Sequence, residues 1–452
     1  MSISARDRER LRTLAAQQME LSQSERNRRL YREWVAFGNR EPGARPMLTI
    51  ELGTFQGEML DPLMQCEGEE ARRIEVHLRE KMFNFQHFGD DFLVPDHYGV
   101  GTHASFIPFS LPPRRHDKAG SIAYEYDPYL VDLEEDFHKL GRSAFRIDEA
   151  ATQAEIAQAE ELFGDLLPVR RQWDGFYICP TQDVVHIMRM EDLYMALYDA
   201  EDLVHRMMEM LTDDYLAYMA LFEQAGLLQP TVRDEHLAQG SYCFTCDLPG
   251  EDVHSFSQVW GYLDSQETSA ISPQMFRDHF FPYYKKLAAR FGQLSYGCCE
   301  PVHGIWDECL STLENLGKVS ISPWCDERMM GERLRGKRTV CLRKPPATLL
   351  GSPGALDWPP SPPAWKAPPR PRRAAGWSWP SATSTRSARA RRRSPATSSS
   401  SARRSTANIS RKPSKKTAAS RSSSGCGGLL RETTRFIPAG WRPARRSRLA
   451  AP

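Results

Sequence analysis

The sequence predicts an α/β fold in which strands and helices alternate along the chain. Between residues 272 and 326 the order is helix, strand, polar cluster, helix, strand, polar cluster, which is typical of repeated β/α winding. Both polar clusters follow predicted strands, and in parallel barrels the carboxyl ends of the strands form the functional face. After residue 358 the composition changes to a basic segment rich in Pro, Ser and Arg. We therefore expect a folded α/β body followed by an unfolded tail.

The first half of the body is predicted mainly from helical spacing of apolar residues. Residues 1–30 are highly charged and predicted to form a helix, and the first strand is expected at 46–51. Residues 90–95 are a short apolar run after two acids, and residues 100–130, with Pro108, Pro112 and Pro113, are predicted to be a loop-rich excursion. The further helices are expected at 71–87, 151–163, 183–198 and 202–225, with Gly164 and Gly226 as stops.

The second half carries the clearest strand and helix signals. An aromatic strand is expected at Val259-Trp-Gly-Tyr262, with Asp264 and Glu267 after it. A helix begins at Ser272, a favoured N-cap that precedes Pro273. A short strand is expected at 294–296, and a helix at 302–316 with Gly317 as its stop. The alternating residues 318–322 predict the next strand, which ends in Pro323-Trp-Cys-Asp326.

The average composition hides a division of charge. The net charge is +1, yet residues 359–452 contain 22 Lys/Arg and one acid, Glu432, so the first 358 residues carry a balance of −20. No apolar run of about 18 residues predicts a membrane span. The N-terminus lacks the apolar core of a signal peptide, and the ten cysteines are spread through a long chain. We expect a cytoplasmic protein with reduced thiols.

The strongest candidate site is Leu294-Ser-Tyr-Gly-Cys-Cys-Glu-Pro-Val-His303. Cys298 lies at the end of a predicted strand, where it can bind a metal or act as a thiolate; the alternative is a pair of buried thiols. Adjacent cysteines rarely bind one metal, so Cys298 is expected to share a zinc ion with His303 and Cys325. Cys298 and Glu300 are also candidate catalytic residues.

Other side chains at predicted strand ends also have a functional and a structural interpretation. Asp264 is a candidate acid or base, and helix capping before Ser272 is its alternative. The pair Cys243 and Cys246, with no second pair at zinc-finger spacing, is expected to be structural, as are His186 and His205. The candidate substrate-binding residues are Asp91, Glu267, Tyr296 and Trp324.

Three segments together resemble the uroporphyrinogen decarboxylase-like superfamily. They are Met188-Arg-Met-Glu-Asp-Leu-Tyr-Met-Ala-Leu-Tyr-Asp199, Ile271-Ser-Pro-Gln-Met-Phe276 and Tyr296-Gly-Cys-Cys-Glu-Pro301. The resemblance covers roughly residues 30–357 and implies a (β/α)₈ barrel of the TIM type, residues 31–358, with its site at the carboxyl ends of the strands.

The resemblance implies two activities. Members that transfer methyl groups work with a corrinoid (cobalamin) protein and hold zinc with a His-x-Cys motif; here that triplet is Tyr296-Gly-Cys298, so histidine is replaced by tyrosine. The decarboxylases act on a tetrapyrrole and carry Met-Arg-Gln-Ala-Gly-Arg near the first strand, where this chain offers only Arg45. Methyl transfer linked to a corrinoid protein is the preferred interpretation, with zinc as a possible cofactor, and tetrapyrrole decarboxylation is the alternative. The expected partners are a small-molecule substrate or a corrinoid protein, with no membrane and no specific nucleic acid.

The tail, residues 359–452, is interpreted as sequence read out of frame. Arg, Pro, Ser and Ala dominate when GC-rich DNA is read in a shifted frame. When residues 377–387 are back-translated into codons and the codons are read from one base earlier, the resulting pattern permits LVVAIRDVYTL, which is typical of a buried strand. We expect this tail to be disordered and the barrel to be incomplete at its C-terminal strands, with two exposed sheet edges and poor solubility. A third interpretation is therefore an inactive, truncated enzyme whose basic tail binds polyanions nonspecifically.

Resequencing the gene tests the frame change. A single-base insertion or deletion near codon 358 is the expected finding, and correcting it should restore an apolar strand pattern over residues 377–387. A relative that carries the same basic tail in an uninterrupted homologous frame would contradict the interpretation.

Overall fold

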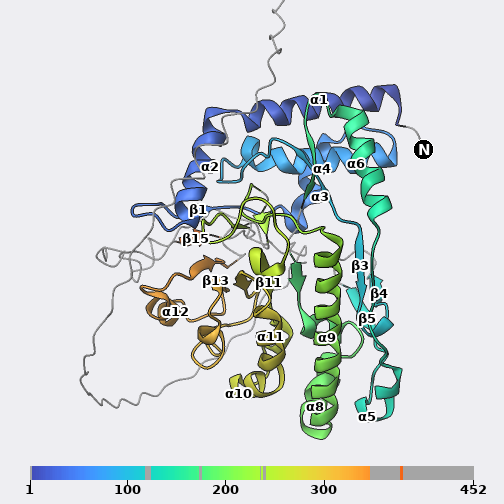
Figure 1. Ribbon diagram of the computed structural model, residues 1–452, viewed down its shortest axis with the longest axis vertical. Coiled ribbons are helices and arrows are strands. Elements are labelled where there is room, and N and C mark those ends of the chain that lie inside the picture. Colours follow the sequence, from blue (N-terminus) through green and yellow to red (C-terminus); the bar gives the residue numbers. More distant parts are fainter. Residues whose placement is uncertain are drawn as a thin grey trace, which may run out of the picture. The chain divides into compact units, whose positions relative to one another are not determined.

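Seven strands, all parallel to their neighbours, form the central sheet (Figure 1). The computed structural model describes residues 3–117, 124–172, 176–234, 236–237, 241–346 and 377–379, all within the unit Met1–Ser387. In sheet order the strands are β1 (Met47–Leu48), β15 (Trp377–Trp379), β14 (Val340–Arg343), β13 (Leu316–Ile321), β12 (Gln293–Tyr296), β11 (Trp260–Leu263) and β8 (Phe176–Ile178).

Smaller paired strands and helices surround this sheet. The pairs are β2 (Tyr98–Gly101) with β7 (Val169–Gln172), β3 (Ala104–Ile107) with β6 (Ala144–Ile147), β4 (Arg114–Asp117) with β5 (Tyr124–Asp127), and β9 (His236–Leu237) with β10 (Ser241–Tyr242). The helices are α1 (Ala5–Ser22), α2 (Glu25–Gly38), α3 (Gln56–Leu60), α4 (Glu69–His87), α5 (Leu133–Asp136), α6 (Glu149–Phe163), α7 (Pro180–Val185), α8 (Met190–Asp199), α9 (Glu201–Ala225), α10 (Pro273–Met275), α11 (Phe281–Ala288) and α12 (Glu327–Leu334).

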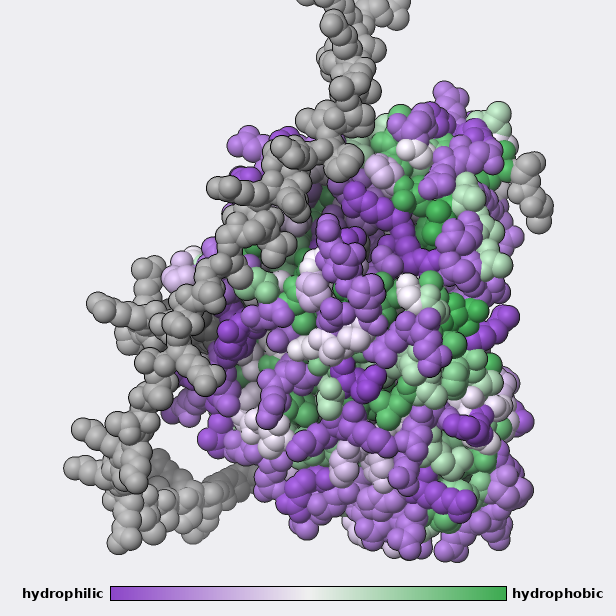
Figure 2. All heavy atoms as spheres, in the orientation of Figure 1, coloured by the Kyte–Doolittle hydropathy of each residue, from purple (hydrophilic) through white to green (hydrophobic). Residues whose placement is uncertain are grey.

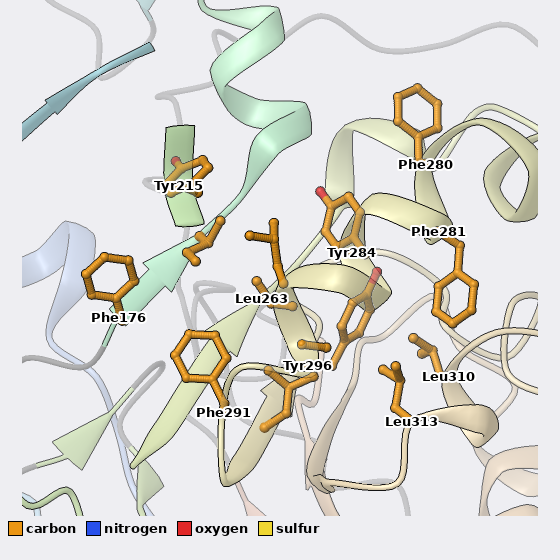
Figure 3. Packing of buried hydrophobic residues seen from close by; sticks show 14 of the residues in the cluster. Phe176, Tyr215, Leu263, Phe280, Phe281, Tyr284, Phe291, Tyr296, Leu310 and Leu313 are labelled. Carbon is orange, nitrogen blue, oxygen red and sulfur yellow. The ribbon is translucent and has the colours of Figure 1, made fainter. Parts of the chain in front are cut away.

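Two buried apolar clusters hold these elements together. The larger cluster joins β8, β11 and β12 to α9 and α11, and Figure 3 shows Phe176, Leu263 and Tyr296 of the strands with Tyr284 of α11. The smaller cluster packs α1, α2, α4 and α6 and includes Met47 of β1. The outer face seen in Figure 2 is mostly hydrophilic, with smaller apolar areas. Within the described ranges, no helix combines the length and the apolar character needed to cross a bilayer.

Local signals explain where several elements begin and end. Ser4 caps α1 by accepting a hydrogen bond from the Asp7 N–H, and Ser24 caps α2 in the same way, so the charged segment is two helices that meet at Ser24. Gly226 ends α9 in the left-handed conformation at φ +65°, as its place in the sequence predicts. The predicted helix 183–198 is interrupted, since α7 ends at Val185 and α8 begins at Met190.

Three predictions from the pattern are wrong. Residues 302–316 form turns and the short 3₁₀ helix Leu310–Thr312, because hydrogen bonds such as Leu310 N–H to Ile305 O do not follow the α-helical spacing. The excursion at 100–130 contains four strands. Gly317 lies inside β13 rather than after a helix: a Cβ there would come within 2.3 Å of the Trp260 ring.

The basic tail lies outside the described residues except for β15. The expectation that the last strand is missing is wrong for residues 377–379, which pair in parallel with both β14 and β1. Tryptophan favours strands, and strand pairing uses backbone groups that are present in every reading frame of the gene. The frame change itself stays a prediction.

Replacing Gly317 by Ala tests the close approach of β13 to the Trp260 ring. We expect the free energy of unfolding to fall by about 1–3 kcal/mol, since the methyl group overfills a packed core. Gly331→Ala is the matched control: nothing lies within 4 Å of a Cβ there, and alanine favours helix α12. Denaturant titration measures both variants, and equal stabilities would contradict the packing argument.

Candidate active site

The carboxyl ends of four strands of the central sheet, β8, β11, β12 and β14, bring polar residues to one edge of the sheet. Cys179 follows β8, Asp264 follows β11, Cys298 follows β12 after one glycine, and Lys344 follows β14. The strands pair with Leu263 opposite both Ile178 and Tyr296, so these ends lie at the same level. This edge is the usual position of catalytic groups in parallel α/β folds.

Glu300 fixes the geometry of this edge. Its Oε1 accepts the Ser265 N–H at 3.0 Å and its Oε2 accepts the Cys298 N–H at 2.7 Å. Burial, followed by the charge of Asp264, raises the pKa of Glu300 to about 7. Sequence analysis proposed Glu300 as catalytic; both of its oxygens are engaged by the backbone, which is the geometry of a positioning residue.

Asp264 is joined to two tyrosines. The Tyr177 hydroxyl lies 3.2 and 3.3 Å from its two oxygens, and the Tyr262 hydroxyl lies 3.0 Å from Oδ2. The two rings stack with centroids 4.9 Å apart. Asp264 is 1% exposed, and burial raises its pKa, whereas Tyr177 is 45% exposed. Both hydroxyls donate to the carboxyl, and Tyr177 links the buried Asp264 to the exposed side of the site.

The adjacent cysteines form a thiol pair beside a lysine. Gly297, at φ +100°, makes the turn that leads into them. Cys298 Sγ lies 3.6 Å from Cys299 Sγ, and Lys344 Nζ lies 2.8 Å from the Cys298 carbonyl oxygen and 3.8 Å from its sulfur. The hydrogen bond from Cys298, helped by the Lys344 charge, lowers the pKa of Cys299 to about 6, while the pKa of Cys298 is raised. The exposed Cys299 is therefore the candidate nucleophile of the pair.

The predicted zinc ligands do not converge. His303 Nδ1 accepts the Asp326 N–H at 3.2 Å, and the buried Cys325 thiol lies 3.6 Å from Ser322 Oγ. A metal site needs ligand atoms that lie close together. Among the described residues, several groups have all their possible ligand atoms within 4.8 Å of one another, but none of these groups contains Cys298, His303 and Cys325 together. A zinc ion held by these three residues does not fit this geometry, because tetrahedral ligands must surround one point.

A different group at the same edge does converge. Cys179, Asp264 and Glu267 are all buried and offer ligand atoms within 4.8 Å of one another. Cys179 donates to the Asp264 carbonyl oxygen at 3.2 Å and to Glu267 Oε2 at 3.4 Å, and Thr181 donates to the same Glu267 oxygen at 2.8 Å. Burial, followed by these carboxylates, holds the pKa of Cys179 well above its ordinary value, so this thiol is a hydrogen-bond donor.

Sequence analysis missed Tyr177, Cys179 and Thr181. The signal that would have found them is Phe176-Tyr-Ile-Cys-Pro180, an aromatic and β-branched run followed by Cys-Pro, which is a strand followed by the start of a helix. The run of only three strand residues is too short for periodicity to separate it from a loop.

Three predicted substrate-binding residues have other surroundings. Asp91 accepts two hydrogen bonds from Arg45 and one from the Leu48 N–H, so it anchors β1. Tyr296 is fully buried, with its hydroxyl 2.7 Å from Ser265 Oγ. Trp324 is 73% exposed beyond β13. Of the four, only Glu267 lies with Asp264 in the converging group.

A cavity of about 430 Å³ adjoins Tyr177. Half of its lining residues are aromatic, and Asp183 and Gln182 are among its polar groups. Burial raises the pKa of Asp183 to about 7, and Tyr215 donates a hydrogen bond to it. The lining residues are Thr102, Ala104, Phe106, Gln172, Phe176, Tyr177, Cys179, Gln182, Asp183, Tyr215, Tyr218 and Phe222.

Comparison with known proteins adds little to this picture. No family model and no curated protein matches the chain. Among solved structures, a methyltransferase from Methanosarcina mazei is similar over 71% of this chain and 85% of that one, with a TM-score of 0.37 and 14% sequence identity. A likeness at this level carries no argument about fold or function, and the resemblance to the uroporphyrinogen decarboxylase-like superfamily stays a prediction.

Alkylation by iodoacetamide tests the thiol pair. Because only the thiolate reacts, the rate at Cys299 should rise with pH to a plateau, with its midpoint near pH 6 instead of the ordinary value of about 8.5. Lys344→Met should move the midpoint to higher pH, since it removes the nearby cation. Lys337→Met is the control, as Lys337 lies over the Trp306 ring. Peptide mass spectrometry assigns the modified residue, and a midpoint near 8.5 would contradict the assignment.

Proposed function

We propose that the chain is a methyltransferase that takes a methyl group from a small aromatic methyl ether and passes it to a corrinoid held by a partner protein. One observation carries the proposal: Tyr177, whose hydroxyl is hydrogen-bonded to the Asp264 carboxyl, lines a cavity that also contains five other aromatic residues. A buried carboxyl with a raised pKa keeps its proton to higher pH than an ordinary carboxyl, and an ether oxygen needs a proton in order to leave.

The cavity chemistry supports an aromatic donor. Tyr177 and Phe106 offer ring faces, and a volume of about 430 Å³ suits a single substituted ring. Asp183, with its raised pKa, and Gln182 can hydrogen-bond ring substituents.

The transfer balances in atoms and electrons. The acceptor's electron pair forms the new bond to the methyl carbon, and the pair of the carbon–oxygen bond stays on the oxygen. That oxygen takes a proton from the Tyr177 hydroxyl, which Asp264 replenishes, and a phenol leaves. The residues of this chain thus orient the ether and supply the proton.

The thiol pair supports an external acceptor. The Cys299 thiolate can attack a methyl group, but the thioether product returns a methyl group poorly, so the enzyme would stop after one turnover. The corrinoid, when bound through its partner, supplies a nucleophile that can be regenerated. Cys298 positions the other two groups, since its carbonyl oxygen accepts a hydrogen bond from Lys344 and its sulfur contacts the sulfur of Cys299.

Tetrapyrrole decarboxylation is less well supported. The same proton donor could serve it, but a tetrapyrrole with several carboxylates needs cationic residues. Among the described residues that line the cavity none is basic, and Arg45 already pairs with Glu33 and Asp91.

We also propose that the sheet closes into the eight-stranded barrel expected from sequence. β1 and β8 end the seven-stranded order, and residues 90–95 can supply a strand between them. In support, the Asp91 N–H donates to the Leu48 carbonyl of β1 at 2.8 Å. A closed sheet would leave no exposed edge.

Methyl transfer from 1,2-dimethoxybenzene to cob(I)alamin tests the function, followed as methylcobalamin formation in the absence of oxygen. Asp264→Asn and Tyr177→Phe should lower kcat by about 10²- to 10⁴-fold. Because the acid must be protonated, kcat should fall as pH rises through the raised pKa of Asp264, and Asp264→Asn should lose this fall.

Asp278→Asn is the control, because Asp278 pairs with Arg277 at the surface. Full activity in Asp264→Asn would contradict the proposal. Release of CO₂ from a tetrapyrrole carboxylate, with no methyl transfer, would establish the alternative.

A further inference from the structure

A second group of possible metal ligands lies outside the candidate active site. Glu201 and His205 are one turn apart at the start of α9, so their side chains share a face. His279 lies opposite them on a π-helical turn, Phe276–Phe280. Such turns occur often at functional positions, because the extra residue redirects side chains.

The three side chains have the spacing of metal ligands. Glu201 Oε1 lies 3.6 Å from His279 Nδ1 and 3.7 Å from His205 Nε2, and the three ligand atoms all lie within 4.8 Å of one another. Zinc bonds of about 2.0–2.1 Å at tetrahedral angles place ligand atoms roughly 3.3–3.4 Å apart. Movements of a few tenths of an ångström would therefore bring Glu201 Oε1 to this spacing from each of the two histidine nitrogens.

His279 gives an independent sign of a ligand. It is 8% exposed, and its Nδ1 is a buried nitrogen without a hydrogen-bond partner among the described residues, aimed at Glu201. A buried polar atom of this kind is unfavourable unless something satisfies it. Glu201, by contrast, is 58% exposed, so the group opens to water on one side.

His205 is already oriented for binding. Its Nδ1 lies 3.0 Å from the Tyr283 hydroxyl, which leaves Nε2 facing Glu201. A hydrogen bond to the second ring nitrogen is the usual way in which proteins fix a histidine ligand. Sequence analysis treated His205 as structural, since His279 is 74 positions away and nothing in the pattern joins them.

We propose that Glu201, His205 and His279 bind one divalent transition-metal ion of the zinc type, with water at the open position. The ion links the first turn of α9 to the π-helical turn before α11, and it stabilises the folded state because it binds that state alone. This site is separate from the candidate active site, and the proposal is independent of methyl transfer.

Cobalt titration of the chelator-treated full-length protein tests the site. One equivalent of Co²⁺ should produce the visible absorbance bands of a four- or five-coordinate ion, Zn²⁺ should displace it, and the melting temperature should rise with metal. Glu201→Gln and His279→Gln should each weaken binding by about 10²-fold or more. His186→Gln and Glu209→Gln are the matched controls and should bind as the parent does.

Several outcomes would overturn the proposal. The first is the absence of a stoichiometric cobalt spectrum, and the second is unchanged affinity in both ligand variants. The third is loss of binding in Cys179→Ser together with a sulfur-to-cobalt charge-transfer band, because that result would place the ion at Cys179, Asp264 and Glu267. Glu201 is exposed, so Glu201→Gln should fold even where His279→Gln does not, and circular dichroism checks both.

Discussion

The carboxylate of Glu300 holds the candidate active site in place. By accepting the N–H groups of Ser265 and Cys298, it ties the end of β11 to the turn after β12. Asp264 directly precedes Ser265, and Cys299 directly follows Cys298, so the positions of the Asp264 carboxyl and the Cys299 thiol both depend on this bridge. Loss of Glu300 would leave two buried N–H groups unsatisfied and release both reactive groups together.

Burial then sets the chemistry of the site. Asp264 lies out of contact with water, which raises its pKa, while the exposed Cys299 beside Lys344 has its pKa lowered. Compared with an ordinary carboxyl and an ordinary thiol, this edge of the sheet favours the protonated form of Asp264 and the ionised form of Cys299.

Sequence reasoning found the strand-end residues and missed what depends on contacts between distant segments. Asp264, Cys298 and Glu300 follow strands with clear patterns, so their common edge was predictable. Cys179 and Tyr177 follow a strand of three residues, which carries no usable periodicity. The proposed zinc ligands Cys298, His303 and Cys325 are not among the converging groups of the described residues. Residues 302–309 form turns instead of the expected helix, and spacing in sequence then says little about distance.

The sequence by itself determined the parallel α/β winding, the division between an acidic body and a basic tail, and the segments that carry reactive side chains, since these follow from local periodicity and composition. Only the tertiary structure decided which side chains meet. It joined Tyr177 to Asp264 across 87 positions, and it set His279 opposite Glu201 and His205. The physical reason is that hydrogen bonds, pKa shifts and metal coordination act over a few ångströms, a scale that sequence separation does not encode.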